Sequence, residues 1–136
     1  MQYLNHEESS VGRGPSHFAE ALLLVLAQRV DLKVVRVVDT AEKALQLLPD
    51  LGLDLLLADV SLPQMNGIDL VARLSKLYPH MPCLLISGHM SSLYAKRGLD
   101  AGARGYAIKD DTAGIIEGID QVLRGEIYIS KELRAP

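Results

Sequence analysis

Three polar side chains follow short apolar segments, and their chemical types are those that phosphoryl transfer needs. Asp59 follows residues 55–58, Ser87 follows residues 84–86, and Lys109 follows residues 106–108. A carboxylate can attack phosphorus and carry an acyl phosphate, while an ammonium group and a hydroxyl can hold the phosphoryl oxygens. Alone, each residue has an ordinary explanation as a turn former, a loop hydroxyl or a solvated strand tip. The interpretation therefore depends on the elements that would bring them together.

The elements predicted around these residues alternate between strand and helix. Apolar runs without strict polar alternation predict strands that are covered on both faces, as in a parallel sheet. Amphipathic spacing predicts helices between and around them. The predicted strands are 33–38, 53–58, 83–86 and 106–108, and the predicted helices are 16–26, 40–48, 70–78, 91–101 and 115–123. This order predicts a doubly wound α/β sandwich, whose ligand site lies at the carboxyl ends of the strands.

Length, charge and cysteine usage exclude several classes of protein. The 136 residues suit one domain, and a net charge of −3 without basic clusters argues against direct DNA binding. Cys83 is the only cysteine, so we expect a buried thiol rather than a disulfide or a metal cluster. The apolar stretch 21–27 is too short to span a membrane. We therefore expect a cytoplasmic protein without membrane contact.

Three motifs, in the order 59–67, 84–89 and 101–110, give the chain a family resemblance. The first reads Asp-Val-Ser-Leu-Pro-Gln-Met-Asn-Gly, the second Leu-Leu-Ile-Ser-Gly-His, and the third Ala-Gly-Ala-Arg-Gly-Tyr-Ala-Ile-Lys-Asp. They resemble the phosphoacceptor loop, the switch-hydroxyl segment and the lysine strand of CheY-like receiver domains in bacterial response regulators. Within that family the chain is similar to the NarL/FixJ class, which usually carries a LuxR-type DNA-binding domain downstream.

The resemblance implies a fold and a role for each polar residue at the strand ends. It implies a flavodoxin-like (βα)5 sandwich with the parallel strand order 2-1-3-4-5. Asp59 would accept a phosphoryl group from a sensor histidine kinase, and Ser87 and Lys109 would bind that group. Tyr106 would change rotamer when Ser87 moves toward the phosphoryl group. The chain would thus be a signalling switch rather than an enzyme.

The resemblance also implies a metal site and a domain organisation. Asp59 and the backbone carbonyl of Ser61 would bind Mg²⁺, while Pro63 and Gly67 would shape the phosphoacceptor loop. The expected organisation is a poorly matched segment 1–15 with a degenerate first strand, a receiver domain 16–130 and the start of a linker 131–136. A homodimer is a further implied partner state. DNA contact would come only through a C-terminal domain that is absent from this chain.

The first strand departs from the family pattern. In the family it ends in two adjacent acidic residues, which hold Mg²⁺ with the phosphoacceptor, but residues 1–15 contain no apolar run ending in this way. One register, counted back from the first helix, places Arg13 and Gly14 at the acidic positions and removes both carboxylates. The other places Glu7 and Glu8 there, and needs a very short strand and about six additional loop residues. We slightly favour the first register.

Two other functions remain open. A pseudo-receiver would keep the fold but act without phosphate, as a dimerisation or protein-interaction module, and the degenerate first strand motivates it. A phosphatase similar to the haloacid dehalogenases would also use Asp, Ser and Lys, but would carry a second Asp where this chain has Ser61. His89, two residues after Ser87, is interpreted as an exposed loop residue rather than a general base.

Overall fold

The computed structural model describes residues 2–4, 17–33, 36–38, 41–47, 53–60, 65–88 and 91–134. Within these ranges the chain forms a six-stranded sheet of order β2-β1-β3-β4-β5-β6, in which every pair of neighbours is parallel. The strands are β1 (Gln2–Leu4), β2 (Arg36–Val38), β3 (Leu56–Asp59), β4 (Cys83–Ser87), β5 (Gly105–Ile108) and β6 (Tyr128–Ile129). The predicted doubly wound fold and its strand order are confirmed, with β6 added at the edge.

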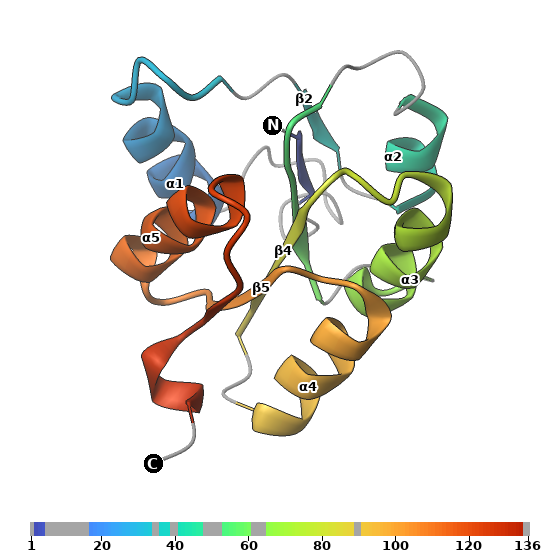
Figure 1. Ribbon diagram of the computed structural model, residues 1–136. Helices are drawn as coiled ribbons and strands as arrows, with labels where there is room; N and C mark the ends of the chain where they lie inside the picture. The colour runs from blue at the N-terminus through green and yellow to red at the C-terminus, as the bar shows by residue number, and fades with distance from the viewer. Residues whose placement is uncertain are drawn as a thin grey trace.

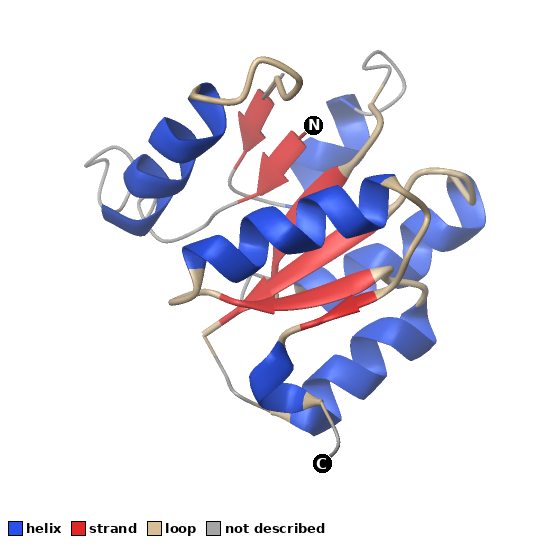
Figure 2. Ribbon diagram, turned by 60° about the vertical axis from the view of Figure 1, so that its left-hand side comes forward, coloured by secondary structure: helices blue, strands red, loops and turns tan. Residues whose placement is uncertain are grey.

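Helices cover both faces of this sheet (Figures 1 and 2). They are α1 (His17–Ala27), α2 (Ala41–Leu47), α3 (Gly67–Leu77), α4 (Ser92–Ala101) and α5 (Thr112–Leu123), followed by the 3-10 turn η3 (Lys131–Leu133). Buried side chains of α1 and α5 form one apolar cluster with the sheet, and those of α2, α3 and α4 form the other. None of the helices within the described ranges is long and apolar enough to cross a membrane.

Side chains of the central strands alternate between the two clusters, which explains why the strand segments read as continuous apolar runs. Leu57 and Leu84 face α1 and α5, whereas Leu85 and Tyr106 face the other helices, and all four are fully buried. A strand buried on both faces needs an apolar residue at every position. The same burial fixes the strand register, because a one-residue slip would exchange the two faces.

Three helices begin at capping side chains shortly after a strand ends. Asn66 Oδ1 accepts a hydrogen bond from Asp69 N at 2.9 Å at the start of α3, and Asp111 Oδ1 accepts one from Gly114 N at 2.9 Å at the start of α5. Ser91 Oγ accepts from Tyr94 N at 3.2 Å and begins α4, the helix with the weakest sequence signal. These caps satisfy amide groups that the first helical turn leaves without partners, and they fix the loops at the carboxyl end of the sheet.

The first strand lies earlier in the chain than the favoured register predicts. β1 is Gln2–Leu4, and Leu4 is paired with Val38 of β2 and with Ala58, the residue before Asp59. The favoured register, which places Arg13 and Gly14 directly after the strand, is therefore wrong, and the alternative with Glu7 and Glu8 stays a prediction. All four of these residues lie outside the described ranges, so their positions relative to Asp59 stay predictions.

Candidate functional site

Asp59 and Lys109 form a buried ion pair at the carboxyl end of the sheet. Asp59 is the last residue of β3, and Lys109 follows β5, two strands away. The Lys109 Nζ to Asp59 Oδ2 distance is 2.9 Å, and the side chains are only 11% and 4% exposed. The fold thus brings together a carboxylate and an ammonium group that are 50 residues apart in the sequence.

Ser87 ends β4, the strand between β3 and β5. Asp59 is paired with Ile86 and Ser87 with Ile108, so the three strand ends are in register. The backbone carbonyl of Ser87 accepts a hydrogen bond from Lys109 N at 2.8 Å, and its side chain is fully buried. The carboxylate, the hydroxyl and the ammonium group therefore come from three adjacent strand ends, as the sequence predicts.

Tyr106 is buried beneath these residues. The residue is 0% exposed, and its hydroxyl shares a hydrogen bond with Ser87. Burial raises the pKa of the Tyr106 phenol, and the Ser87 hydroxyl opposes that rise because it stabilises the phenolate. Tyr106 therefore remains a neutral hydroxyl at physiological pH and can donate its proton to Ser87.

Burial also lowers the pKa of Lys109, with the charge of Asp110 acting in the opposite direction. Removing an ammonium group from water disfavours its charged form. An additional anion on Asp59 would compensate this cost, because it would bring more negative charge to a cation held in a poorly solvated position. The site is therefore arranged to accept negative charge.

The start of α3 packs directly on the backbone of Asp59. Gly67 N donates a hydrogen bond to Val60 O at 3.0 Å, and an added Cβ on Gly67 would lie 2.5 Å from the Asp59 carbonyl oxygen. No side chain fits there without moving backbone, so glycine is required by close approach rather than by an unusual φ angle. The neighbouring Ser61 and Pro63, predicted to shape this loop, lie outside the described residues, as does His89.

The described residues do not by themselves form the predicted Mg²⁺ site. No group of three or more His, Cys, Asp or Glu side chains within the described ranges could hold a metal ion. Oδ2 of Asp59 is bound by Lys109. Mg²⁺ requires several oxygen ligands in near-octahedral geometry, and Asp59 alone does not supply them. The other proposed ligands, Ser61, Glu7 and Glu8, lie outside the described residues.

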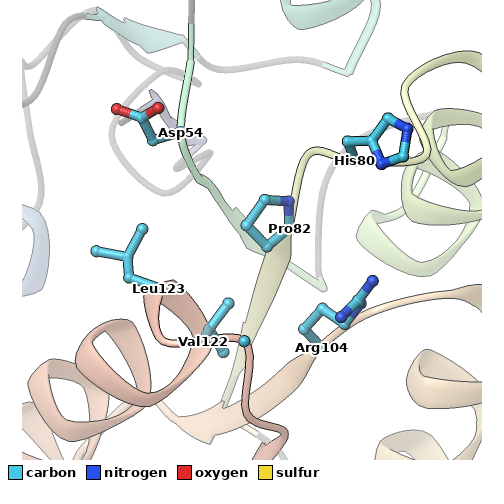
Figure 3. A pocket seen from close by; sticks show the side chains of 7 residues that line it. Asp54, His80, Pro82, Arg104, Val122 and Leu123 are labelled. Atoms are coloured by element: carbon cyan, nitrogen blue, oxygen red, sulfur yellow. The ribbon is translucent and has the colours of Figure 1, made fainter.

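A separate hollow of about 430 Å³ lies at the opposite end of the strands (Figure 3). It is lined by Asp54, His80, Pro82, Arg104, Val122, Leu123 and Gly125. Asp54 precedes β3, Pro82 precedes β4 and Arg104 precedes β5. The hollow is therefore separated from Asp59 by the length of the strands and takes no part in the ion pair.

One backbone contact of Tyr106 could not be expected from the sequence. Ser130 N donates a hydrogen bond to the Tyr106 carbonyl at 3.0 Å and continues the ladder between β5 and β6. The short apolar segment from Ile127 to Ile129 is the available signal, but a strand of two residues is too short to recognise from periodicity.

Comparison with known proteins places this geometry in a family. A family model described as the response regulator receiver domain matches residues 16–120. The transcriptional regulatory protein DegU of Brevibacillus brevis is 31% identical over 113 residues, which are 82% of this chain and 48% of DegU. UhpA of Escherichia coli is 29% identical over 110 residues, which are 80% of this chain and 55% of UhpA. The chain spans about half the length of these curated relatives.

Solved structures share the fold. A LuxR-family two-component response regulator from Aurantimonas sp. SI85-9A1 has a TM-score of 0.82 at 22% identity, covering 97% of this chain and 91% of that one. The signal receiver domain of the putative response regulator NarL from Mycobacterium tuberculosis has a TM-score of 0.75 at 24% identity, covering 92% and 97%. These two structures show the shared fold, while the family model and the relative DegU confirm the expected resemblance to response regulators. Because the family model matches most of the chain, the chain belongs to the response regulator receiver domains.

Proposed function

We propose that the chain is a phosphorylation-driven switch in which Asp59 accepts a phosphoryl group from a sensor histidine kinase. Receiver domains interact with sensor kinases, and this chain is one. The observation that carries the proposal is the buried pair of Asp59 and Lys109 beside Ser87, at 2.9 Å between Nζ and Oδ2. A cation, a hydroxyl and a nucleophilic carboxylate at one poorly solvated sheet edge favour an acyl phosphate.

The proposed transfer uses only groups of this chain and the kinase phosphohistidine. A carboxylate oxygen of Asp59 attacks the phosphorus atom, a P–O bond forms, and the P–N bond to the imidazole breaks. Lys109 Nζ then moves its hydrogen bond from the carboxylate to a phosphoryl oxygen, and the Ser87 hydroxyl donates to another. Receiver domains generally bind Mg²⁺, which would offset the negative charge of the phosphoryl oxygens beside Asp59.

The direct experiment is incubation with acetyl phosphate and Mg²⁺, followed by intact mass spectrometry. We expect one added phosphate on the wild-type chain and none on Asp59→Asn. Asp69→Asn, which removes an exposed carboxylate on α3, is the matched control and should still gain the phosphate. No added phosphate on the wild-type chain, or label that survives Asp59→Asn, would contradict the proposal.

The output is proposed to be transcriptional and to depend on a downstream DNA-binding domain. Two relatives are called transcriptional regulatory proteins, and one neighbour of 15% identity is titled as two RcsB dimers bound to two parallel DNAs. We extend both features to this protein as proposals: a homodimer driven by phosphorylation, and DNA contact through a separate domain. In this proposal the chain is a switch and has no turnover of its own, so steady hydrolysis of p-nitrophenyl phosphate would contradict it.

A phosphate-independent receiver is the second candidate. It is favoured by the sequence after the first strand, Gln2–Leu4, which continues with Asn5 and His6 rather than with two acidic residues. Beryllofluoride, a phosphoryl mimic, separates the two candidates. An unchanged oligomeric state in light scattering supports this second candidate, and a dimer induced by beryllofluoride supports the switch.

A further inference from the structure

The segment after α5 covers the outer edge of β5. We call residues Tyr128–Arg134 the C-terminal arm. Tyr128 N donates to Arg104 O and Ser130 N donates to Tyr106 O, each at 3.0 Å, so the arm adds a strand to the sheet. Figure 2 shows the arm running along this edge to the helical turn beside the C-terminus. An edge that would otherwise be open is thus paired within the chain.

Tyr128 anchors the arm in a slot on α5. The residue is 2% exposed. An added Cβ on Gly118 would lie 2.9 Å from Tyr128 Cδ2, and one on Gly114 would lie 2.9 Å from the Tyr128 hydroxyl oxygen. Glycine weakens a helix relative to alanine, so Gly118 is explained by the room that it gives the ring. Gly114 gives room first to the capping carboxylate of Asp111 and then to the Tyr128 hydroxyl.

The other end of the arm packs on the opposite face of the sheet. Leu133 contacts the cluster that contains Tyr106, whereas Tyr128 belongs to the cluster of α1 and α5. Arg134 Nε donates to Ile129 O at 2.8 Å, and its guanidinium lies 5.8 Å from the centre of the Tyr128 ring. The arm therefore holds both faces at the β5 edge.

We propose that the C-terminal arm is a latch whose docking is coupled, through Tyr106, to the state of the phosphoryl site. Tyr106 is the residue that joins the two regions: its carbonyl binds Ser130, its ring shares a cluster with Leu133, and its hydroxyl binds Ser87. The coupling to the phosphoryl site rests on the proposed function. The contact between the arm and Tyr106 is independent of the proposed function.

The direction of the coupling follows from hydrogen-bond chemistry. A serine hydroxyl has one proton to donate and two lone pairs to accept. Ser87 can therefore donate to a phosphoryl oxygen while it accepts from the buried Tyr106, and the two bonds polarise and strengthen each other. A phosphoryl group then favours buried Tyr106, and buried Tyr106 favours the docked arm. By linkage, the docked arm favours the phosphoryl group to the same extent.

The first experiment tests the arm and Tyr106 without any phosphoryl group. Gly118→Ala places a methyl group in the Tyr128 slot and should displace the ring. We expect the side-chain NMR signals of both Tyr128 and Tyr106 to change in protein with labelled tyrosine. The same substitution in a Tyr128→Ala background should leave Tyr106 unaffected, because no ring remains to be displaced. A response of Tyr128 without one of Tyr106 would overturn the latch.

The second experiment tests the coupling itself by hydrogen exchange with and without beryllofluoride and Mg²⁺. We expect exchange at the amides of Tyr128 and Ser130 to slow about fivefold or more, and Gly118→Ala to weaken beryllofluoride binding by a similar factor. Lys76→Ala, an exposed change on α3 away from the arm, should retain the wild-type response. Beryllofluoride binding that leaves the arm amides unchanged would overturn the coupling. A wild-type chain that neither binds beryllofluoride nor accepts phosphate would instead contradict the proposed function and the coupling that rests on it. The contact between the arm and Tyr106 would then be judged by the first experiment alone.

Discussion

Asp59 and Lys109 stabilise each other in a position where neither charge would be tolerated alone. Their side chains are almost completely removed from water, and their charged atoms are 2.9 Å apart. A buried pair of this kind adds little compared with two apolar residues, but the loss of one partner leaves an uncompensated buried charge. At the scale of single residues, each of the two buried charges therefore depends on the presence of the other.

Removal of the lysine should expose this dependence. We expect Lys109→Met to lower the free energy of unfolding by about 3 kcal/mol, because it leaves the Asp59 carboxylate buried without its cation. Asp59→Asn in the same background should recover part of that loss, since it also removes the buried negative charge. Urea denaturation followed by circular dichroism measures both effects. Lys96→Met on the exposed face of α4 is the control, and equal effects of the two lysine substitutions would contradict the argument.

The elements that matter most for the site are the end of β3 and the start of α3. These two elements touch through Gly67, whose hydrogen bond to Val60 O brings the helix against the backbone of Asp59. Because backbone meets backbone there, a larger residue cannot be accommodated by a side-chain rotation. The position of the Asp59 carboxylate is thus set by a helix terminus as well as by its own strand.

Gly67→Ala tests this contact between elements. We expect it to lower the free energy of unfolding by about 1–3 kcal/mol, since an added Cβ would lie 2.5 Å from Asp59 O and 3.0 Å from Val60 Cα. It should also slow the labelling of Asp59 by acetyl phosphate. Gly88→Ala is a matched control for stability, because a Cβ there meets no atom within 4 Å. Equal free energies of unfolding for Gly67→Ala and Gly88→Ala would contradict this expectation, because they would mean that the backbone adjusts to the added methyl group without loss of stability.

The elements that were predicted correctly are those that bury an apolar pattern on their own. β3, β4 and β5 form from continuous apolar runs, and the capping residue Ser91 marks the start of even the weak helix α4. Only the favoured one of the two registers for the first strand was wrong, because residues 2–4 form a strand through pairing with two neighbours, and pairing leaves no trace in local periodicity.

The same limit applies to the site. Its three strand-end residues could be predicted because the carboxyl ends of parallel strands share one edge. The slot for Tyr128 could not be predicted, because Gly118 looks like a helix-weakening residue until the ring that packs against it is seen. Contacts between distant segments decide such features, and a single sequence does not contain them.

At the scale of the whole molecule, both apolar layers contain acids that stay neutral because they are buried. Burial raises the pKa of the Cys83 thiol to about 12, although the charge of Arg104 acts against it. Burial likewise raises the pKa values of Tyr106 and Tyr128. In the unfolded chain a thiol ionises near pH 8.5 and a phenol near pH 10. Folding therefore keeps protons that the unfolded chain releases at alkaline pH.

The consequence is a loss of stability as the pH rises above about 8.5. There the unfolded state binds fewer protons than the folded state, so the free energy of unfolding falls with increasing pH, and Lys109, whose pKa is lowered, opposes this only in part. The thiol alone should contribute a fall of about 1 kcal/mol between pH 9 and pH 10. Urea denaturation at pH 7, 8, 9 and 10 measures the trend. Cys83→Ala removes the thiol, so we expect the free energy of unfolding of this variant to fall by about 1 kcal/mol less than that of the wild-type chain between pH 9 and pH 10. Parallel curves for the two chains would mean that the Cys83 thiol ionises as readily in the fold as outside it.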